Sequence, residues 1–199
     1  MMRVIDNFFK DPYAIRKLAL KQTYKPDPDF KWPGMRMDFY KNPALDSYRI
    51  KYADCYKKFL DVPCEAGWMY FQSIDKSWGQ GICHADRSVR YTIITYLNID
   101  SPPDSGTEVY GETFEAFHDF LHKSADIKKS FFRKEKNLID TYLYNKKLKK
   151  FNSKFTDPCI VPNKFNRTLI FEGKRIHRAQ NFFGTTLADS RLTLISFFK

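Results

Sequence analysis

His84 and Asp86 are the two side chains in this sequence whose types and spacing most clearly suggest chemistry. They are two positions apart, so in an extended segment both side chains point to one face. An imidazole beside a carboxylate supplies two ligands for a divalent metal, and we expect His177, far along the chain, to be the third. Two histidines and one carboxylate leave coordination positions open, which suits non-heme Fe(II) oxygen chemistry, although zinc accepts the same ligands.

A second pair of residues follows His177. Arg191 and Thr193 are again two positions apart, at the start of a largely apolar run that ends at Phe198. A buried guanidinium needs a partner, and its planar fork binds a carboxylate through two hydrogen bonds, to which a nearby hydroxyl can add one more. The pair therefore predicts a binding site for a carboxylate co-substrate. A surface charge on an edge strand is the alternative interpretation of Arg191.

The order His84-x-Asp86, His177, Arg191-x-Thr193 resembles the Fe(II)/2-oxoglutarate-dependent dioxygenase family. Other segments are similar to parts of its prolyl-hydroxylase-type members: the N-terminal opening, the strand that ends in Tyr-Leu-Asn, and a Gly-Gly-Thr strand (4–9, 90–98 and 105–110). Within the family, the chain most resembles an uncharacterised bacterial and phage group that combines a Pro-Gly-x-Arg segment with a Val-Pro-x-Lys-Phe-Asn-Arg strand (33–36 and 161–167). The likeness spans nearly the whole chain, except residues 123–154.

The resemblance implies a fold and a set of site residues. It implies a mainly β chain with flanking helices, folded as a double-stranded β-helix (a jelly roll, cupin-like), with the metal inside its mouth. Fe(II) would be held by His84, Asp86 and His177. The co-substrate 2-oxoglutarate would be bound by Arg191, with Thr193 and Tyr96 beside it; Tyr96 is equally explained as a core aromatic. O2 would be the other reactant, and ascorbate is left open as a further cofactor.

The substrate is less closely defined by the resemblance. Prolyl-hydroxylase-like strands favour hydroxylation of a peptide or protein side chain. A free amino acid or another small molecule is the first alternative, and oxidative modification of nucleic acid is the second. A non-catalytic binding module is disfavoured, because a chain without catalysis has no reason to keep all three metal ligands and Arg191.

The pattern of the chain predicts short strands with flanking helices. Asp11-Pro12 reads as a helix start. We expect helices over 11–21, 44–60, 112–123 and 125–150, strands over 68–74, 91–98, 107–110, 167–171 and 192–198, and a hairpin-like turn over 172–174. Short strands separated by turns favour a barrel or jelly roll. We expect one domain over 1–199, in which a helical supporting region (1–66) precedes a β core (67–199) with a basic insert (123–154).

Composition restricts the remaining alternatives. The net charge is +11, and residues 123–154 hold eleven Lys or Arg against three acidic residues, a balance that can attract nucleic acid. A Lys-, Phe- and Asn-rich composition also reflects an AT-rich genome, so nucleic-acid binding is not favoured. The sequence has neither an apolar run of membrane-spanning length nor a signal peptide, and its four cysteines form no Cys-x-x-Cys motif. We therefore expect a cytoplasmic protein with reduced thiols and no membrane partner. His118 and His122, four positions apart, are a weaker candidate for a second metal site.

Overall fold

Two antiparallel sheets face each other in the computed structural model, which describes residues 1–29, 32–113 and 138–199. The larger sheet has seven strands in the order β1-β8-β5-β10-β4-β3-β2, and the smaller has three in the order β7-β6-β9. The bounds of the strands are β1 Met2–Ile5, β2 Lys25–Pro26, β3 Met35–Asp38, β4 Ala66–Ile74, β5 Tyr91–Tyr96, β6 Thr107–Thr113, β7 Cys159–Val161, β8 Thr168–Glu172, β9 Arg175–Ala179 and β10 Arg191–Phe198. The predicted mainly β fold is confirmed.

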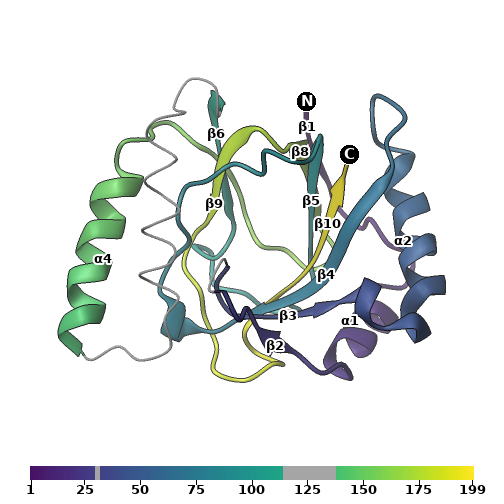
Figure 1. Ribbon diagram of the computed structural model, residues 1–199, viewed down its shortest axis with the longest axis horizontal. Helices are drawn as coiled ribbons and strands as arrows, with labels where there is room; N and C mark the ends of the chain where they lie inside the picture. The colour runs from purple at the N-terminus through teal and green to yellow at the C-terminus, as the bar shows by residue number, and fades with distance from the viewer. Residues whose placement is uncertain (30–31, 114–137) are drawn as a thin grey trace.

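Helices cover the outer faces of both sheets (Figure 1). α1 (Pro12–Leu20) and α2 (Asp46–Lys57) pack on the larger sheet, and α4 (Leu138–Asn152) packs on the smaller one. Short 3-10 helices lie at Phe39–Lys41 (η1), Pro43–Leu45 (η2) and Lys76–Trp78 (η3). Among the described residues, no helix is both long and apolar enough to cross a membrane.

The alternation of side chains in β10 divides the interior into two layers. Leu192, Leu194 and Phe198 belong to the core between the larger sheet and α1 and α2. Arg191 and Thr193 occupy the alternate positions, which face the smaller sheet. A separate cluster that includes Tyr96 and Val109 fills the space between the two sheets. Polar residues of the predicted site are thus directed between the sheets.

The first helix shows why the local sequence signals succeeded. α1 begins after Asp11, whose side chain accepts a hydrogen bond from the Ala14 N–H at 3.0 Å, and proline occupies its first turn. The second predicted helix begins only at Asp46, because the preceding turn is the 3-10 helix η2. The expectation of helix over 125–150 is confirmed where the structure describes it, since α4 covers Leu138–Asn152.

Four expectations about elements were wrong. Residues 112 and 113 belong to β6 instead of starting a helix; the rest of that predicted helix lies outside the described residues. The turn at 172–174 joins β8 and β9 in different sheets, so it closes no hairpin. The strand over 161–167 ends at Val161, and Asn166 adopts a left-handed φ of 60°. The region 1–66 is more than a helical support, since it contributes β1, β2 and β3 to the larger sheet.

Asn166 has a structural reason for its unusual backbone. Its side chain accepts a hydrogen bond from the Phe9 N–H and donates one to the Phe9 carbonyl, both at 2.9 Å. The neighbouring Arg167 binds the Asp6 carboxylate through Nε at 2.6 Å and through a terminal nitrogen at 3.0 Å. These contacts tie the N-terminal segment to the sheet, so the motif at 161–167 serves the fold.

Candidate active site

His84, Asp86 and His177 converge between the two sheets. His177 Nε2 lies 3.4 Å from Asp86 Oδ2, and His84 Nε2 lies 3.9 Å from Asp86 Oδ1. One ligand atom from each residue lies within 4.8 Å of the others, and no other group of this kind occurs among the described residues. The structure therefore brings together the three residues predicted from their spacing. The alternative metal pair, His118 and His122, lies outside the described residues.

The backbone explains why two distant segments meet. His84 lies outside the regular strands and forms an isolated bridge with His177 of β9. The His84 N–H donates to the His177 carbonyl at 3.0 Å, and the His177 N–H donates to the His84 carbonyl at 2.9 Å. The segment is nevertheless extended, so His84 and Asp86 share one side. Cys83 points to the opposite side, into the core under α4.

Hydrogen bonds orient each imidazole. His84 Nδ1 lies 2.8 Å from the Ile82 carbonyl oxygen, and His177 Nδ1 lies 3.0 Å from that of Arg175. A carbonyl can only accept, so each Nδ1 carries a proton and each Nε2 is the nitrogen that faces Asp86. Nε2 is therefore the nitrogen that each ring would offer to a metal ion, in place of any proton it carries.

The third ligand residue is held in its ionised form. Thr92 Oγ1 donates to Asp86 Oδ2 at 2.7 Å. Burial raises the pKa of Asp86, but the hydrogen bond with His177 and the charges of the two imidazoles lower it more. The pKa of this carboxyl therefore lies well below its usual range, and the group is a carboxylate over the whole neutral range.

Arg191 is buried next to this group without a carboxylate partner among the described residues. Only 3% of the residue is exposed. Its Nε donates to the Ser105 carbonyl at 3.3 Å, and a terminal nitrogen donates to Thr107 Oγ1 at 3.2 Å. Burial lowers the pKa of Arg191, although an arginine remains charged at neutral pH. An enclosed guanidinium that has only neutral partners is suited to receive an anion.

Tyr96 and Thr193 lie beside Arg191 but behind the cavity wall. The Arg191 guanidinium carbon is 5.5 Å from the Tyr96 ring centroid. The Tyr96 hydroxyl donates to Thr107 Oγ1 at 2.7 Å, which makes it part of the support around Arg191. Thr193 pairs with Tyr96 across the strands, and its buried hydroxyl has no hydrogen-bond partner. Neither residue is among those that line the cavity.

A cavity of about 230 Å³ joins the two predicted sites. Its wall includes all three metal-ligand candidates and Arg191, together with Thr92, Thr107 and several apolar residues. Arg36 and Trp32, which we had not assigned to the site from sequence, also line it. The cavity therefore offers a metal-binding group and an anion-binding group to one small ligand.

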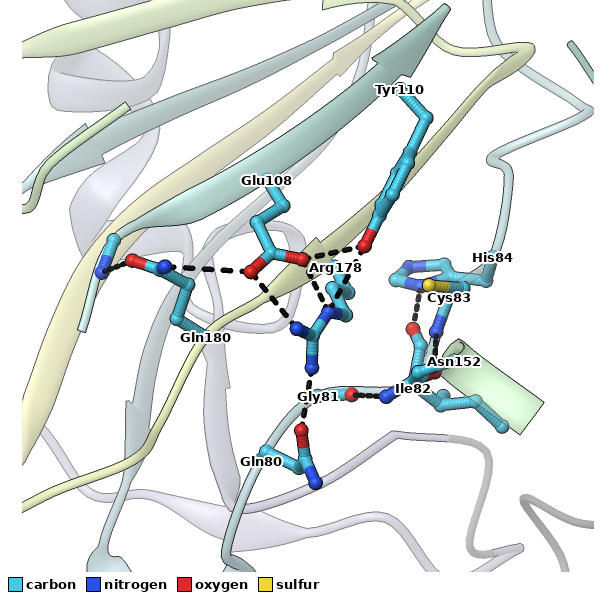
Figure 2. Close-up of polar contacts among 11 residues, drawn as sticks. Gln80, Gly81, Ile82, Cys83, His84, Glu108, Tyr110, Asn152, Arg178 and Gln180 are labelled. Atoms are coloured by element: carbon cyan, nitrogen blue, oxygen red, sulfur yellow. Dashed lines mark hydrogen bonds and ion pairs between the residues drawn. The ribbon is translucent and has the colours of Figure 1, made fainter. Parts of the chain in front are cut away.

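A polar network on the outer side of β6 and β9 supports the ligand segment (Figure 2). Arg178 makes two hydrogen bonds to the Glu108 carboxylate, at 2.5 and 2.9 Å, and one to Gln80 Oε1 at 2.5 Å. Because Glu108 and Arg178 are paired residues of neighbouring strands, this bond fixes the strand that carries His177. Arg178 therefore supports the site from behind, so its position beside a ligand in sequence does not make it a substrate contact.

Asn152, the last residue of α4, attaches the basic insert to the ligand segment (Figure 2). Its Oδ1 accepts from the Cys83 N–H at 3.0 Å, and its Nδ2 donates to the Gly81 carbonyl at 2.9 Å. Both contacts are within three residues of His84. Sequence reasoning missed this residue because its partners are backbone atoms, which leave no signal in side-chain types.

The chain matches known proteins by its structure and not by its sequence. No family model and no curated protein sequence matches the chain. Solved structures do match it along nearly its full length. A prolyl-4-hydroxylase from Pseudomonas putida is 14% identical with a TM-score of 0.57, over 100% of this chain and 91% of that one.

Two further structures are similar at 10% identity. The non-heme α-ketoglutarate-dependent carbocyclase SnoK from nogalamycin biosynthesis has a TM-score of 0.62, over 100% of this chain and 79% of that one. A prolyl hydroxylase from Trichoplax adhaerens, in complex with a peptide fragment of hypoxia inducible factor, has a TM-score of 0.60, over 99% of this chain and 82% of that one. The chain thus has the double-stranded β-helix fold of the non-heme 2-oxoglutarate oxygenases.

Proposed function

We propose that the protein is an Fe(II)- and 2-oxoglutarate-dependent oxygenase. The observation that carries the proposal is the presence, in one cavity, of a His-Asp-His group and a buried arginine with no carboxylate partner among the described residues. A zinc hydrolase would need the metal ligands but not the arginine. The fold shared with 2-oxoglutarate-dependent enzymes supports the same conclusion.

The donor set fits a divalent iron. His84 and His177 would bind through Nε2, because Nδ1 of each ring is engaged by a backbone carbonyl. Asp86 would bind as a carboxylate, its geometry held by the Thr92 hydroxyl. Three protein ligands leave positions open for a co-substrate and O2. A bound iron would supply, with these two reactants, the chemistry that hydroxylates an unactivated C–H bond.

Arg191 would anchor the far carboxylate of 2-oxoglutarate. Thr107 and Tyr96 hold the guanidinium in place, and Thr193 offers a buried hydroxyl beside them. Thr92 and the apolar lining residues Ile94 and Ile195 restrict the remaining space. The protein's part in the reaction is therefore to orient the co-substrate, position the C–H bond and limit the access of water.

Hydroxylation of a peptide or protein side chain is the preferred substrate class. It is supported by the similarity to two prolyl hydroxylases, one of which was determined with a peptide fragment. A small molecule is the second candidate, because the metal cavity is only about 230 Å³ and SnoK comes from nogalamycin biosynthesis. Nucleic acid has no comparable support.

An assay of 2-oxoglutarate turnover tests the proposal. The purified protein is supplied with Fe(II), ascorbate and 2-oxoglutarate, and the release of succinate is measured with and without candidate peptides and amino acids. We expect iron-dependent succinate release that stops in His177→Ala and falls in Arg191→Ala. Arg49→Gln, an exchange on the surface of α2, should behave as wild type. Succinate release that needs no iron, or that survives in His177→Ala, would contradict the proposal.

A further inference from the structure

Arg36 is a second arginine in the metal cavity and has no role in the proposed binding of metal or 2-oxoglutarate. It lies on β3, opposite Gln72 of β4, and Gln72 lies opposite Thr193 of β10. Paired residues project to the same face of a sheet, so Arg36 faces the inside of the fold together with Thr193. Its side chain lines the cavity that contains the three metal-ligand candidates.

Two aromatic rings hold the Arg36 guanidinium, and none of the described residues offers it a hydrogen-bond acceptor. The guanidinium carbon lies 4.3 Å from the centroid of Trp32 and 5.0 Å from that of Tyr70. Its Nε is buried with no hydrogen-bond partner, and no described carboxylate oxygen is within ion-pair distance. Burial lowers the pKa of Arg36 to about 10, so the group is still cationic at neutral pH. A buried donor without an acceptor costs free energy, which an entering anion would recover.

The backbone before Arg36 is placed by a constrained turn. Gly34 has a φ of +71°, and a Cβ at this position would lie 2.3 Å from the Ser73 carbonyl oxygen. Gln72 Nε2 donates to the Pro33 carbonyl at 3.0 Å. The turn therefore presses the chain against β4 and fixes where the Arg36 side chain leaves the backbone.

Arg36 stands where the metal cavity meets a second, larger cavity of about 780 Å³. Both cavities are lined by Arg36 and Trp32, and the second also includes Trp68, Tyr70 and Lys25. A ligand that enters the metal cavity from this side passes the guanidinium. Arg191 is more deeply enclosed than Arg36, so it suits the co-substrate, whereas Arg36 suits the substrate.

We propose that Arg36, which contacts the rings of Trp32 and Tyr70, binds a carboxylate of the substrate and directs the substrate toward His84, Asp86 and His177. The proposal rests on the function proposed above and adds the substrate's chemical class. The carboxylate can be the α-carboxylate of an amino acid or a peptide end, or the side chain of an acidic residue in a peptide. Recognition uses the planar fork of arginine, which lysine lacks.

A binding experiment with matched probes tests this assignment. The protein is loaded with Mn(II) and 2-oxoglutarate, which prevents turnover, and its tryptophan fluorescence is followed because Trp32 contacts Arg36. One set of probes is the N-acetyl derivatives of the common amino acids, each compared with its primary amide. The other is N-acetyl-Gly-Asp-Gly-amide compared with its Asn counterpart. The two sets distinguish the two sources of the carboxylate.

We expect at least one acid to bind about tenfold more tightly than its uncharged partner, the effect of one hydrogen bond to a charged group. Arg36→Gln should abolish this preference, and Arg36→Lys should keep only part of it. Arg49→Gln is the matched control, because Arg49 also lies over a tyrosine ring, at 4.5 Å from Tyr40, but outside the cavity. Its preference should equal that of wild type.

Several results would overturn the assignment. The wild-type protein could bind every acid and its uncharged partner equally, or it could bind none of the acids. The preference could also survive in Arg36→Gln while circular dichroism shows that this variant is folded. Binding of 2-oxoglutarate to the wild-type protein is measured in the same samples. If the wild-type protein did not bind 2-oxoglutarate, the proposed function would be contradicted. If it bound 2-oxoglutarate but showed no carboxylate preference, only the role of Arg36 would be contradicted.

Discussion

At the scale of single residues, His177 joins the two halves of the candidate metal site. Its ring contacts Asp86 at 3.4 Å, and its backbone bonds to His84 in both directions. His177→Ala removes the imidazole but leaves the backbone bridge, so we expect loss of metal binding without loss of fold. Iron content after anaerobic loading should fall from about one per chain to none. His118→Ala serves as the comparison, and an unchanged iron content in His177→Ala would refute the ligand assignment.

Arg191 gives a prediction about the co-substrate. Arg191→Ala should weaken the binding of 2-oxoglutarate by roughly 2–5 kcal/mol, the usual cost of removing one partner of a buried charged pair. Arg191→Lys keeps the charge but loses the fork and the bond to Thr107, so its affinity should also fall clearly. Isothermal titration of the Mn(II)-loaded protein measures both values. Wild-type affinity in Arg191→Ala would place the anchor elsewhere.

The residues that sequence reasoning identified most clearly are either of a type that is rare in this chain or unlike their sequence neighbours. The chain has four histidines, and Arg191 is a charge at the edge of an apolar run. Arg36 and Asn152 carry no such mark, because their roles arise from contacts with aromatic rings and backbone atoms that only the folded chain brings together. The place of Arg178 was within reach of the sequence, because strand alternation puts it on the face opposite His177.

At the scale of elements, the strands rich in β-branched residues were predicted nearly to their bounds, as β5 and β10 show. The short strands β2 and β3, at one end of the larger sheet, were missed, since two to four residues carry too little pattern. A turn also does not specify which sheet the next strand joins, which is why the link from β8 to β9 was misread.

The helix α4 supplies a prediction at this scale. Asn152→Ala removes both hydrogen bonds to the segment that carries His84, so that segment should lose its fixed position. We expect metal affinity to fall about 10- to 100-fold, as is usual when a group that supports a metal ligand is removed. Competition with a chelating dye, at a temperature well below unfolding, measures this affinity.

Ser153→Ala is the matched control for Asn152→Ala. Ser153 is the next residue, is exposed, and bonds only within its own helix end, to the Lys150 carbonyl at 3.1 Å. Its replacement should leave metal affinity unchanged. If Asn152→Ala lowered the melting temperature of the metal-free protein but not the metal affinity, the residue would support the fold alone.

At the scale of the whole molecule, the charge of +11 raises the question of nucleic-acid binding. Each phosphate that a protein neutralises releases counterions, so binding that depends on many phosphates weakens steeply with salt. Lysines 146, 147, 149 and 150 of α4 are exposed, whereas the helix is anchored through Asn152 and the apolar residues Leu148 and Phe151. We therefore expect the affinity for nucleic acid to depend only weakly on salt.

In a titration of single-stranded DNA or RNA, the slope of log K against log salt should be less steep than about −4. A variant in which all four of these lysines are replaced by glutamine should release succinate as the wild type does. If the wild-type slope were steeper than this value and the variant's slope were shallower, nucleic acid would rank above peptides as the substrate class.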